Sequence, residues 1–103
     1  MQKTKTDSGL FIDAIQLQKS ALIFRAINHP LRQQIMGLLH THPGMSVTEL
    51  YRKLKLEQSV ASQHLAILRR ANFVSARRES KKVFYSVNHG RLEYVTEKAN
   101  ALI

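Results

Sequence analysis

The pattern of hydrophobic and polar positions along this chain changes from helical spacing to strand-like alternation and back. Apolar residues recur at helical spacing over residues 9–27, and the turn signal Asn28-His29-Pro30 ends this first predicted helix. A second helix is predicted over residues 31–40, because Pro30 suits a first helical turn and Pro43-Gly44 favours a turn after it. The inward positions of the second helix are Leu31, Ile35, Leu38 and Leu39.

Two shorter helices are predicted next, joined by a tight turn at residues 55–57. Ser46 and Glu49 form a capping box, in which the Ser46 hydroxyl accepts the Glu49 N–H and the carboxylate returns to the Ser46 N–H. The third helix follows, with Val47, Leu50 and Leu54 inward. The fourth helix covers residues 58–71. Its spacing places Ala61, Leu65 and Leu68 on one face and Ser59, Ser62, Gln63, Ala66 and Arg70 on the other.

The rest of the chain predicts a β-hairpin and a last helix. Residues 74–78 and 82–87 are rich in strand-forming residues and flank a turn at residues 79–81. Asn88-His89-Gly90 breaks the hairpin, and residues 91–103 form the last helix, with Leu92, Val95, Ala99 and Leu102 on one stripe. The pattern predicts a mainly α fold with a β-hairpin, as a single domain over residues 1–103. Residues 1–8 are expected to be a flexible N-terminus.

The net charge of the chain is strongly positive and unevenly distributed. It has 16 Lys and Arg against 7 Asp and Glu, a formal net charge of +9. Residues 52–91 hold ten of these cations and two of the anions, so the excess lies on the two short helices and the hairpin. Such an excess favours a polyanionic partner, and nucleic acid fits better than a membrane surface because the cations do not follow one long helix face.

Several classes of protein are excluded or disfavoured by composition. The chain has no cysteine, which excludes disulfides, thiolate metal sites and thiol redox switches. No signal peptide and no apolar run of about 18 residues is present, so we expect a cytoplasmic protein without a membrane span. No nucleophile–base pairing, paired carboxylates in a pocket-forming context or Gly-rich phosphate loop is evident, so we do not expect an enzyme.

The polar face of the fourth helix is the candidate DNA-reading surface. Ser59, Ser62 and Gln63 are the candidate base readers, because a Gln amide can bond an adenine edge twice and Ser can donate or accept. Gln58 opens the helix, where backbone N–H groups hold phosphates. His64 lies between the two faces, and either contacts a phosphate or packs half-buried. The alternative for this face is a solvated helix surface.

Cations beside this helix are the candidate phosphate contacts. Those of the hairpin could follow phosphates or enter a minor groove, or could simply discourage edge-to-edge aggregation. Those at the end of the fourth helix face phosphates or solvent. The two sets are Arg77, Arg78, Lys81 and Lys82, and Arg69 and Arg70.

Four segments of the chain resemble the ArsR/SmtB family of bacterial winged-helix repressors. AINHPLR at residues 26–32 is similar to the family's ALADPTR, and SVTEL at 46–50 to its SVGEL. QSVASQHLAILR at 58–69 is similar to QSTVSRHLKLLR, and RRESKKVFYSV at 77–87 to the wing sequence RREGRKVYYRL. The resemblance covers nearly the whole chain. Glu57 departs from it, because the family usually has a Ser or Thr there that caps the recognition helix; Glu57 can still favour the helix dipole.

The resemblance implies a winged helix-turn-helix fold of order α-α-α-α-β-β-α and a homodimer packed through the first and last helices. Apolar stripes at both chain ends suit a self-complementary interface, although they could instead form a ligand-binding surface. The expected interface residues are Leu10, Phe11, Ile15, Leu22, Leu92, Val95, Ala99 and Leu102.

The metal ligands of the family are missing from the matching positions. The resemblance would place a Cys-x-Cys in the third helix, or an Asp-x-His and a His-x-x-His on the last helix, and neither set is present. His40 and His42 supply two ligands beside a turn, fewer than a zinc site needs. We therefore expect no metal and no cofactor.

These observations lead to one hypothesis and two alternatives. The chain is expected to be a dimeric repressor of transcription that binds a pseudo-palindromic duplex, with recognition helices about 34–36 Å apart. The alternatives are a non-specific architectural DNA binder and a protein-interaction module that kept the fold. The sequence does not identify an effector, the operator or the regulated genes.

Overall fold

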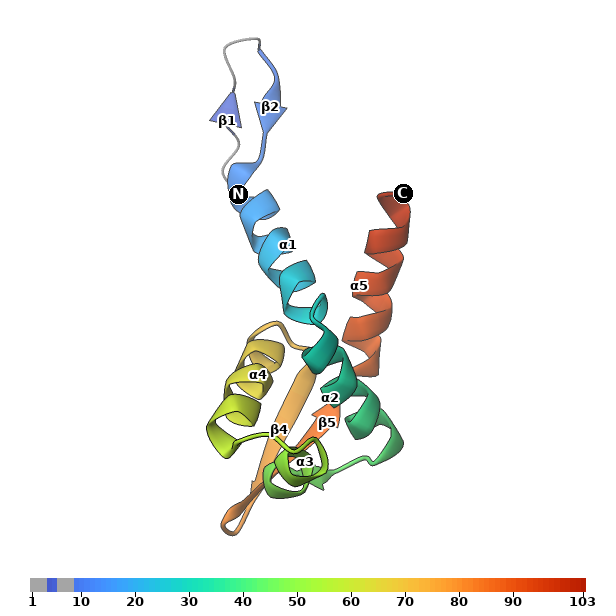
Figure 1. The fold of residues 1–103 in the computed structure, drawn as a ribbon. Helices are drawn as coiled ribbons and strands as arrows, with labels where there is room; N and C mark the ends of the chain where they lie inside the picture. Colours follow the sequence, from blue (N-terminus) through green and yellow to red (C-terminus); the bar gives the residue numbers. More distant parts are fainter. Residues whose placement is uncertain (1–3, 6–8) are drawn as a thin grey trace.

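The computed structural model describes residues 4–5 and 9–103, and it contains the predicted helices in the predicted order (Figure 1). The helices are α1 (Ala14–Ile27), α2 (Pro30–Thr41), α3 (Val47–Lys53), α4 (Gln58–Arg70) and α5 (His89–Ala101). The wing consists of β4 (Val74–Glu79) and β5 (Lys82–Val87), and β3 (Met45–Ser46) adds to it in the order β3-β5-β4. The mainly α fold with a β-hairpin is therefore confirmed.

The core lies where α2, α3 and α4 meet the inner face of the wing. The largest fully buried side chains are Ile35, Leu39, Leu50, Leu65, Leu68 and Phe73. Five of these six were expected inward from helical spacing alone. Burying a side chain of this size contributes about 1.5–3 kcal/mol, so this cluster fixes how α4 sits on the rest of the fold.

The first helix is shorter than the spacing predicts. It begins at Ala14, because the carboxylate of Asp13 accepts the backbone N–H of Gln16 at 3.1 Å and caps the helix. Before this cap the chain is extended, and β2 (Phe11–Ile12) pairs with β1 (Thr4–Lys5) in an antiparallel arm. Phe11 continues the helical spacing of apolar residues in the sequence, but in the structure it lies in the strand β2.

The expectation of a flexible N-terminus concerns residues that are mostly outside the described part of the chain. Thr4 and Lys5 are described and form β1, opposite Ile12 and Phe11. The remaining residues of the segment, 1–3 and 6–8, lie outside the described residues.

The last helix begins two residues earlier than predicted. Asn88 accepts the backbone N–H of Arg91 through its side-chain oxygen at 3.1 Å, so the predicted break at residues 88–90 is the N-cap and first turn of α5. His29 acts in the same way on α2, where its Nδ1 accepts the Leu31 N–H at 3.1 Å. Both polar turn signals therefore start helices as well as ending the preceding element.

The helices α3 and α4 end in backbone turns of the same type, each with one residue at positive φ. After α3, Leu56 N–H bonds to Tyr51 carbonyl and Lys55 N–H to Arg52 carbonyl, with Lys55 at a φ of 55°. After α4, Phe73 N–H bonds to Leu68 carbonyl, and Asn72 adopts a φ of 66°. The first turn aims α4, and the second places Phe73 in the core.

Two capping predictions differ in outcome. Ser46 accepts the Glu49 N–H at 3.2 Å as expected, but its hydroxyl, not its backbone N–H, contacts the Glu49 carboxylate at 3.1 Å. Ser46 is also the end of β3, opposite Phe84 of β5. Glu57 occupies the N-cap of α4 without a side-chain hydrogen bond to the helix, so it contributes charge and not a cap.

Candidate DNA interface

The polar residues of α4 project away from the core. Gln58, Ser59, Ser62 and Gln63 are exposed, whereas Ala61, Leu65 and Leu68 on the opposite face are buried. Ala66, on the polar side, is half-buried. The first two turns of the helix therefore present short hydroxyl and amide side chains to the outside, which is the chemistry that reads base edges.

The wing divides its cations between its two faces. Strand residues alternate in direction, so Arg77 shares a face with Phe84, opposite it on β5, while Arg78 lies on the other face with Val83. Arg77 Nη2 lies 3.2 Å from Glu79 Oε2, and its guanidinium is 5.4 Å from the centre of the Phe84 ring. Arg78, Lys81 and Lys82 are exposed, and the only ion pair among the described residues is the one that Arg77 makes.

His64 is held by a buried arginine that sequence reasoning did not single out. Arg32, 8% exposed, donates from Nε to the Ala26 carbonyl at 2.6 Å and from Nη2 to the Arg25 carbonyl at 3.1 Å. Its Nη1 lies 3.3 Å from Nδ1 of His64. Because a guanidinium can only donate, Nδ1 is the acceptor, and the ring proton of neutral His64 is on Nε2. One side chain thus joins the end of α1 to the recognition helix.

The environment of His64 favours its neutral form. Partial burial lowers the pKa of His64 below the usual value of about 6.5, and the nearby His29 and Arg32 lower it further. The His29 and His64 rings are 5.0 Å apart between centroids. Of the two roles open to His64, the packing role is the one for which the structure provides contacts.

A sequence signal for Arg32 was available. It lies four residues before Met36 and seven before Leu39, both buried, so helical spacing places Arg32 on the inward stripe of α2. A cation at such a position needs buried acceptors, and the free carbonyls at the end of α1 supply them. Arg91 is a second case, since its Nε donates to the Ala71 carbonyl at 3.0 Å and joins α5 to the end of α4.

The other predicted phosphate contacts lie on the surface. Arg69 and Arg70 are exposed in the last turn of α4, away from the Ser and Gln residues that open it. Basic residues at a helix C-terminus also interact favourably with the helix dipole. Arg69 and Arg70 can therefore stabilise α4 whether or not they contact DNA.

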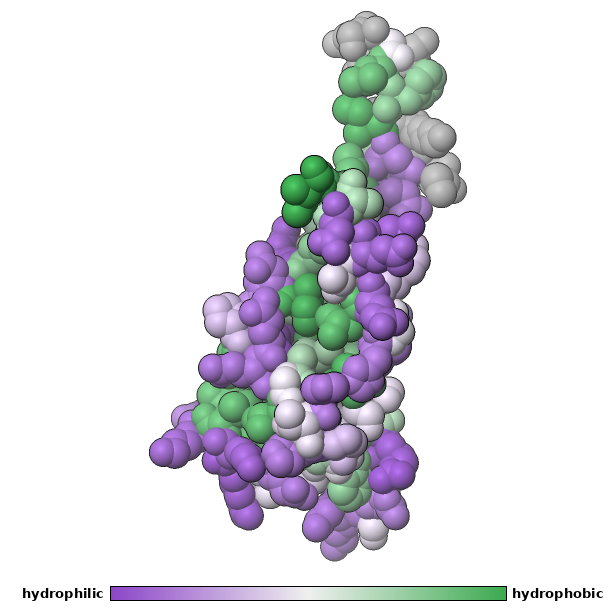
Figure 2. All heavy atoms as spheres, turned by 90° about the vertical axis from the view of Figure 1, so that its right-hand side faces the viewer, coloured by the Kyte–Doolittle hydropathy of each residue, from purple (hydrophilic) through white to green (hydrophobic). Residues whose placement is uncertain are grey.

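Five of the eight residues expected at a dimer interface form an exposed apolar surface. Leu10, Phe11, Leu22 and Leu102 are more than half exposed, Ile15 is 38% exposed, and Leu92 and Ala99 are half-buried. Figure 2 shows hydrophobic residues running from the N-terminal arm down this side of the molecule, with hydrophilic residues at the end that carries the wing. Val95 differs, because it is 6% exposed and belongs to the protomer core.

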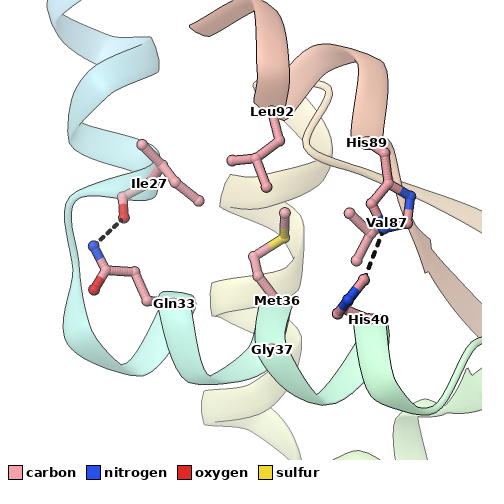
Figure 3. A pocket seen from close by; sticks show the side chains of 8 residues that line it. All are labelled: Ile27, Gln33, Met36, Gly37, His40, Val87, His89 and Leu92. Atoms are coloured by element: carbon pink, nitrogen blue, oxygen red, sulfur yellow. Dashed lines mark hydrogen bonds between the residues drawn. The ribbon is translucent and has the colours of Figure 1, made fainter. Parts of the chain in front are cut away.

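The histidines near the turn after α2 do not form a metal cluster in the structure. His40 Nδ1 lies 3.0 Å from Nε2 of His89 at the start of α5, on the rim of a cavity of about 410 Å³ between α2 and α5 (Figure 3). The part of the chain that the structure describes holds no group of three or more His, Asp or Glu side chains placed to bind a metal. Nor does it hold a helix long and apolar enough to cross a membrane.

Comparisons with known proteins agree with this architecture. Residues 27–75 match a family described as a helix-turn-helix domain. The transcriptional repressor PagR of Bacillus anthracis is 30% identical over 91 residues, which are 88% of this chain and 91% of PagR. The transcriptional activator HlyU of Vibrio cholerae is 36% identical, over 82% of this chain and 77% of HlyU.

Solved structures give the same result. The crystal structure of NolR from Sinorhizobium fredii matches with a TM-score of 0.69 at 30% identity, over 99% of this chain and 93% of that chain. PagR and HlyU are named as regulators of transcription and not as enzymes. The chain therefore belongs to the ArsR/SmtB family of winged helix-turn-helix transcriptional regulators.

Proposed function

We propose that this protein is a dimeric, sequence-specific repressor of transcription that binds a two-fold symmetric operator. The observation that carries the proposal is the exposed Gln58, Ser59, Ser62 and Gln63 face of α4 beside a wing whose Arg78, Lys81 and Lys82 have no acidic partner among the described residues. Cations of this kind give affinity for any duplex, and short polar side chains in a major groove give sequence choice.

A homodimer is supported by the exposed apolar surface of α1, α5 and the arm. A self-complementary apolar surface at both chain ends suits a two-fold axis. A two-fold axis would place one α4 in each of two successive major grooves, about 34–36 Å apart. The protein would act in the cytoplasm, where the DNA of a bacterium is found.

The proposal of repression follows PagR, which is named as a repressor, whereas HlyU is named as an activator. A repressor needs only to occupy its operator, so the proposal takes occupancy alone as the mechanism.

The test is a selection from a random DNA library with the purified full-length protein, followed by footprinting on the enriched sequence. We expect a two-fold symmetric motif with half-sites about 10 base pairs apart. Repeating the selection with zinc and with a strong chelator is expected to give the same motif, because no described group supplies three metal ligands.

Two results would contradict the proposal. Salt-sensitive binding to all sequences without a motif would indicate an architectural DNA binder. Absence of DNA binding at low salt would indicate a protein-interaction module that retained the fold.

A further inference from the structure

A cleft of about 460 Å³ lies where the C-terminal half of α1 meets the C-terminal end of α4. Its volume falls in the range of about 300–1,000 Å³ that small-molecule sites occupy. Its apolar walls come from both helices: Leu22, Ile23 and Ala26 from α1, Ile67 from α4, and Ala71 directly after it. Leu22, which is 61% exposed, is also one of the residues expected at the dimer interface. Ala26 and Ala71 are buried, and Ile23 and Ile67 are half-buried.

The charged residues of the cleft all have one sign. Lys19, Arg25, Arg32 and Arg70 line it, and no carboxylate does. Three of these cations are exposed at the rim, and Arg32 is buried at the inner end of the contact between the two helices. A cleft lined by apolar side chains and by cations complements a molecule with an apolar body and an anionic end.

We propose that the cleft between α1 and α4 binds a small amphipathic organic anion, a carboxylate on an aliphatic or aromatic body. The apolar body would rest on Ile23 and Ile67, and the carboxylate would lie between the rim cations and Arg32, accepting hydrogen bonds from both. The apolar walls of this site are separate from the exposed polar face of α4 and from the wing, and Arg70 is the one lining residue that is also a predicted phosphate contact.

Arg32 connects this site to the recognition helix. Its guanidinium lines the cleft and also lies 3.3 Å from Nδ1 of His64. A carboxylate beside the guanidinium is a stronger acceptor than a neutral imidazole, so occupancy draws Arg32 away from His64. Occupancy thereby removes one contact that fixes α4, and it weakens operator binding. This regulatory step rests on the proposed function, whereas binding in the cleft does not.

The first test measures binding without DNA. The full-length protein is titrated with 4-phenylbutyrate, with the neutral 4-phenylbutanol as the matched probe, and backbone amide shifts are followed by NMR. We expect saturable shifts centred on residues 23–26 and 67–71 for the carboxylate, and at least about tenfold weaker binding for the alcohol. The Lys19→Glu/Arg25→Glu variant is expected to lose the carboxylate response, and Lys98→Glu, a single charge reversal on α5, to keep it.

The proposal is overturned if the alcohol binds as well as the carboxylate, or if the shifts spread over the apolar surface of α1 and α5. It is also overturned if the carboxylate does not bind while Lys19→Glu/Arg25→Glu weakens binding to duplex DNA, because the cations would then serve DNA phosphates.

A second test addresses regulation. Saturating 4-phenylbutyrate is expected to weaken binding of the selected operator at least about fivefold for the wild-type protein and not for Lys19→Glu/Arg25→Glu. Unchanged operator affinity in the presence of a bound carboxylate overturns the coupling through Arg32. A protein that binds no operator at all contradicts the proposed function, and the NMR titration still decides whether the cleft is a site.

Discussion

Gln63 and the wing lysines have different proposed roles in DNA binding. Gln63 is an exposed amide on the polar face of α4, while Lys81 and Lys82 are exposed cations at the wing tip. We expect Gln63→Ala to lower operator affinity by about 1–3 kcal/mol and leave binding to random DNA almost unchanged. Competition binding with operator and random duplexes measures both.

The double variant Lys81→Ala/Lys82→Ala provides the contrast. It is expected to weaken binding to every sequence and to make the salt dependence less steep, by a slope of about 1 for each lost phosphate contact. Equal losses on operator and random DNA for Gln63→Ala would show that Gln63 is a positioning residue and not a base reader.

The pH dependence of stability follows from His64. Its pKa is lowered in the folded protein, so the unfolded chain binds a proton more readily and stability rises with pH in this range. The contribution of the neutral ring is complete above about pH 6.5 and is lost as pH falls through the lower pKa of the folded state. We expect denaturant unfolding to show falling stability below about pH 6.5.

His64→Gln removes this titration and is expected to flatten the profile, whereas His42→Gln, which changes an exposed loop histidine, should reproduce the wild-type profile. A profile for His64→Gln that is as steep as the wild type would mean that another group controls the acid sensitivity.

Residues on the surface of α4 were predictable, and their buried partners were less so. Helical spacing places Ser59, Ser62 and Gln63 outward because it needs no knowledge of neighbouring elements. Arg32 contacts carbonyls at the end of α1 and a ring on α4. That contact depends on how three helices meet, and spacing within one helix does not contain this information.

At the scale of elements, the turn between α3 and α4 carries conformational strain. Lys55 has a φ of 55°, a conformation that costs a residue with a Cβ about 1–2 kcal/mol and glycine little. We expect Lys55→Gly to stabilise the protein by about 1 kcal/mol in denaturant unfolding. Lys53→Gly, two residues earlier and helical, should destabilise it. Stabilisation by Lys53→Gly as well would show that the gain does not come from the φ of Lys55.

The two faces of the wing predict unequal roles for two adjacent arginines. Arg77 is engaged by Glu79 and the Phe84 ring, while Arg78 has no ion pair within the described residues. We therefore expect Arg78→Ala to weaken DNA binding more than Arg77→Ala. Binding titrations at one fixed salt concentration compare the two. A larger loss for Arg77→Ala would indicate that DNA replaces the Glu79 contact.

The elements that the periodicity predicted best are those whose apolar faces lie on the protomer core. The limits of α2, α4 and the wing strands were close, because their apolar stripes follow the core directly. The start of α1 was wrong, since Asp13 and an extended arm decide it. The spacing of apolar residues predicts an element only when those residues face the core of their own protomer.

At the scale of the whole molecule, the exposed apolar surface predicts the oligomeric state. Ile15→Glu places a charge on α1 where 38% of the side chain is exposed, and burying that charge in a dimer is costly. We expect the variant to shift from dimer to monomer in sedimentation velocity and to lose operator binding. Gln34→Glu, the same charge on exposed α2, serves as the control. A dimer unaffected by Ile15→Glu would place the interface elsewhere.

The composition of α1 has a consequence for gene control. Among its fourteen residues only Ala26 is buried, so in the proposed dimer the helix would gain much of its packing from pairing. The concentration of paired protein then rises roughly as the square of total protein while monomers predominate. Operator occupancy would change sharply over a narrow range of copy number, and a cell could relieve repression by modestly lowering synthesis.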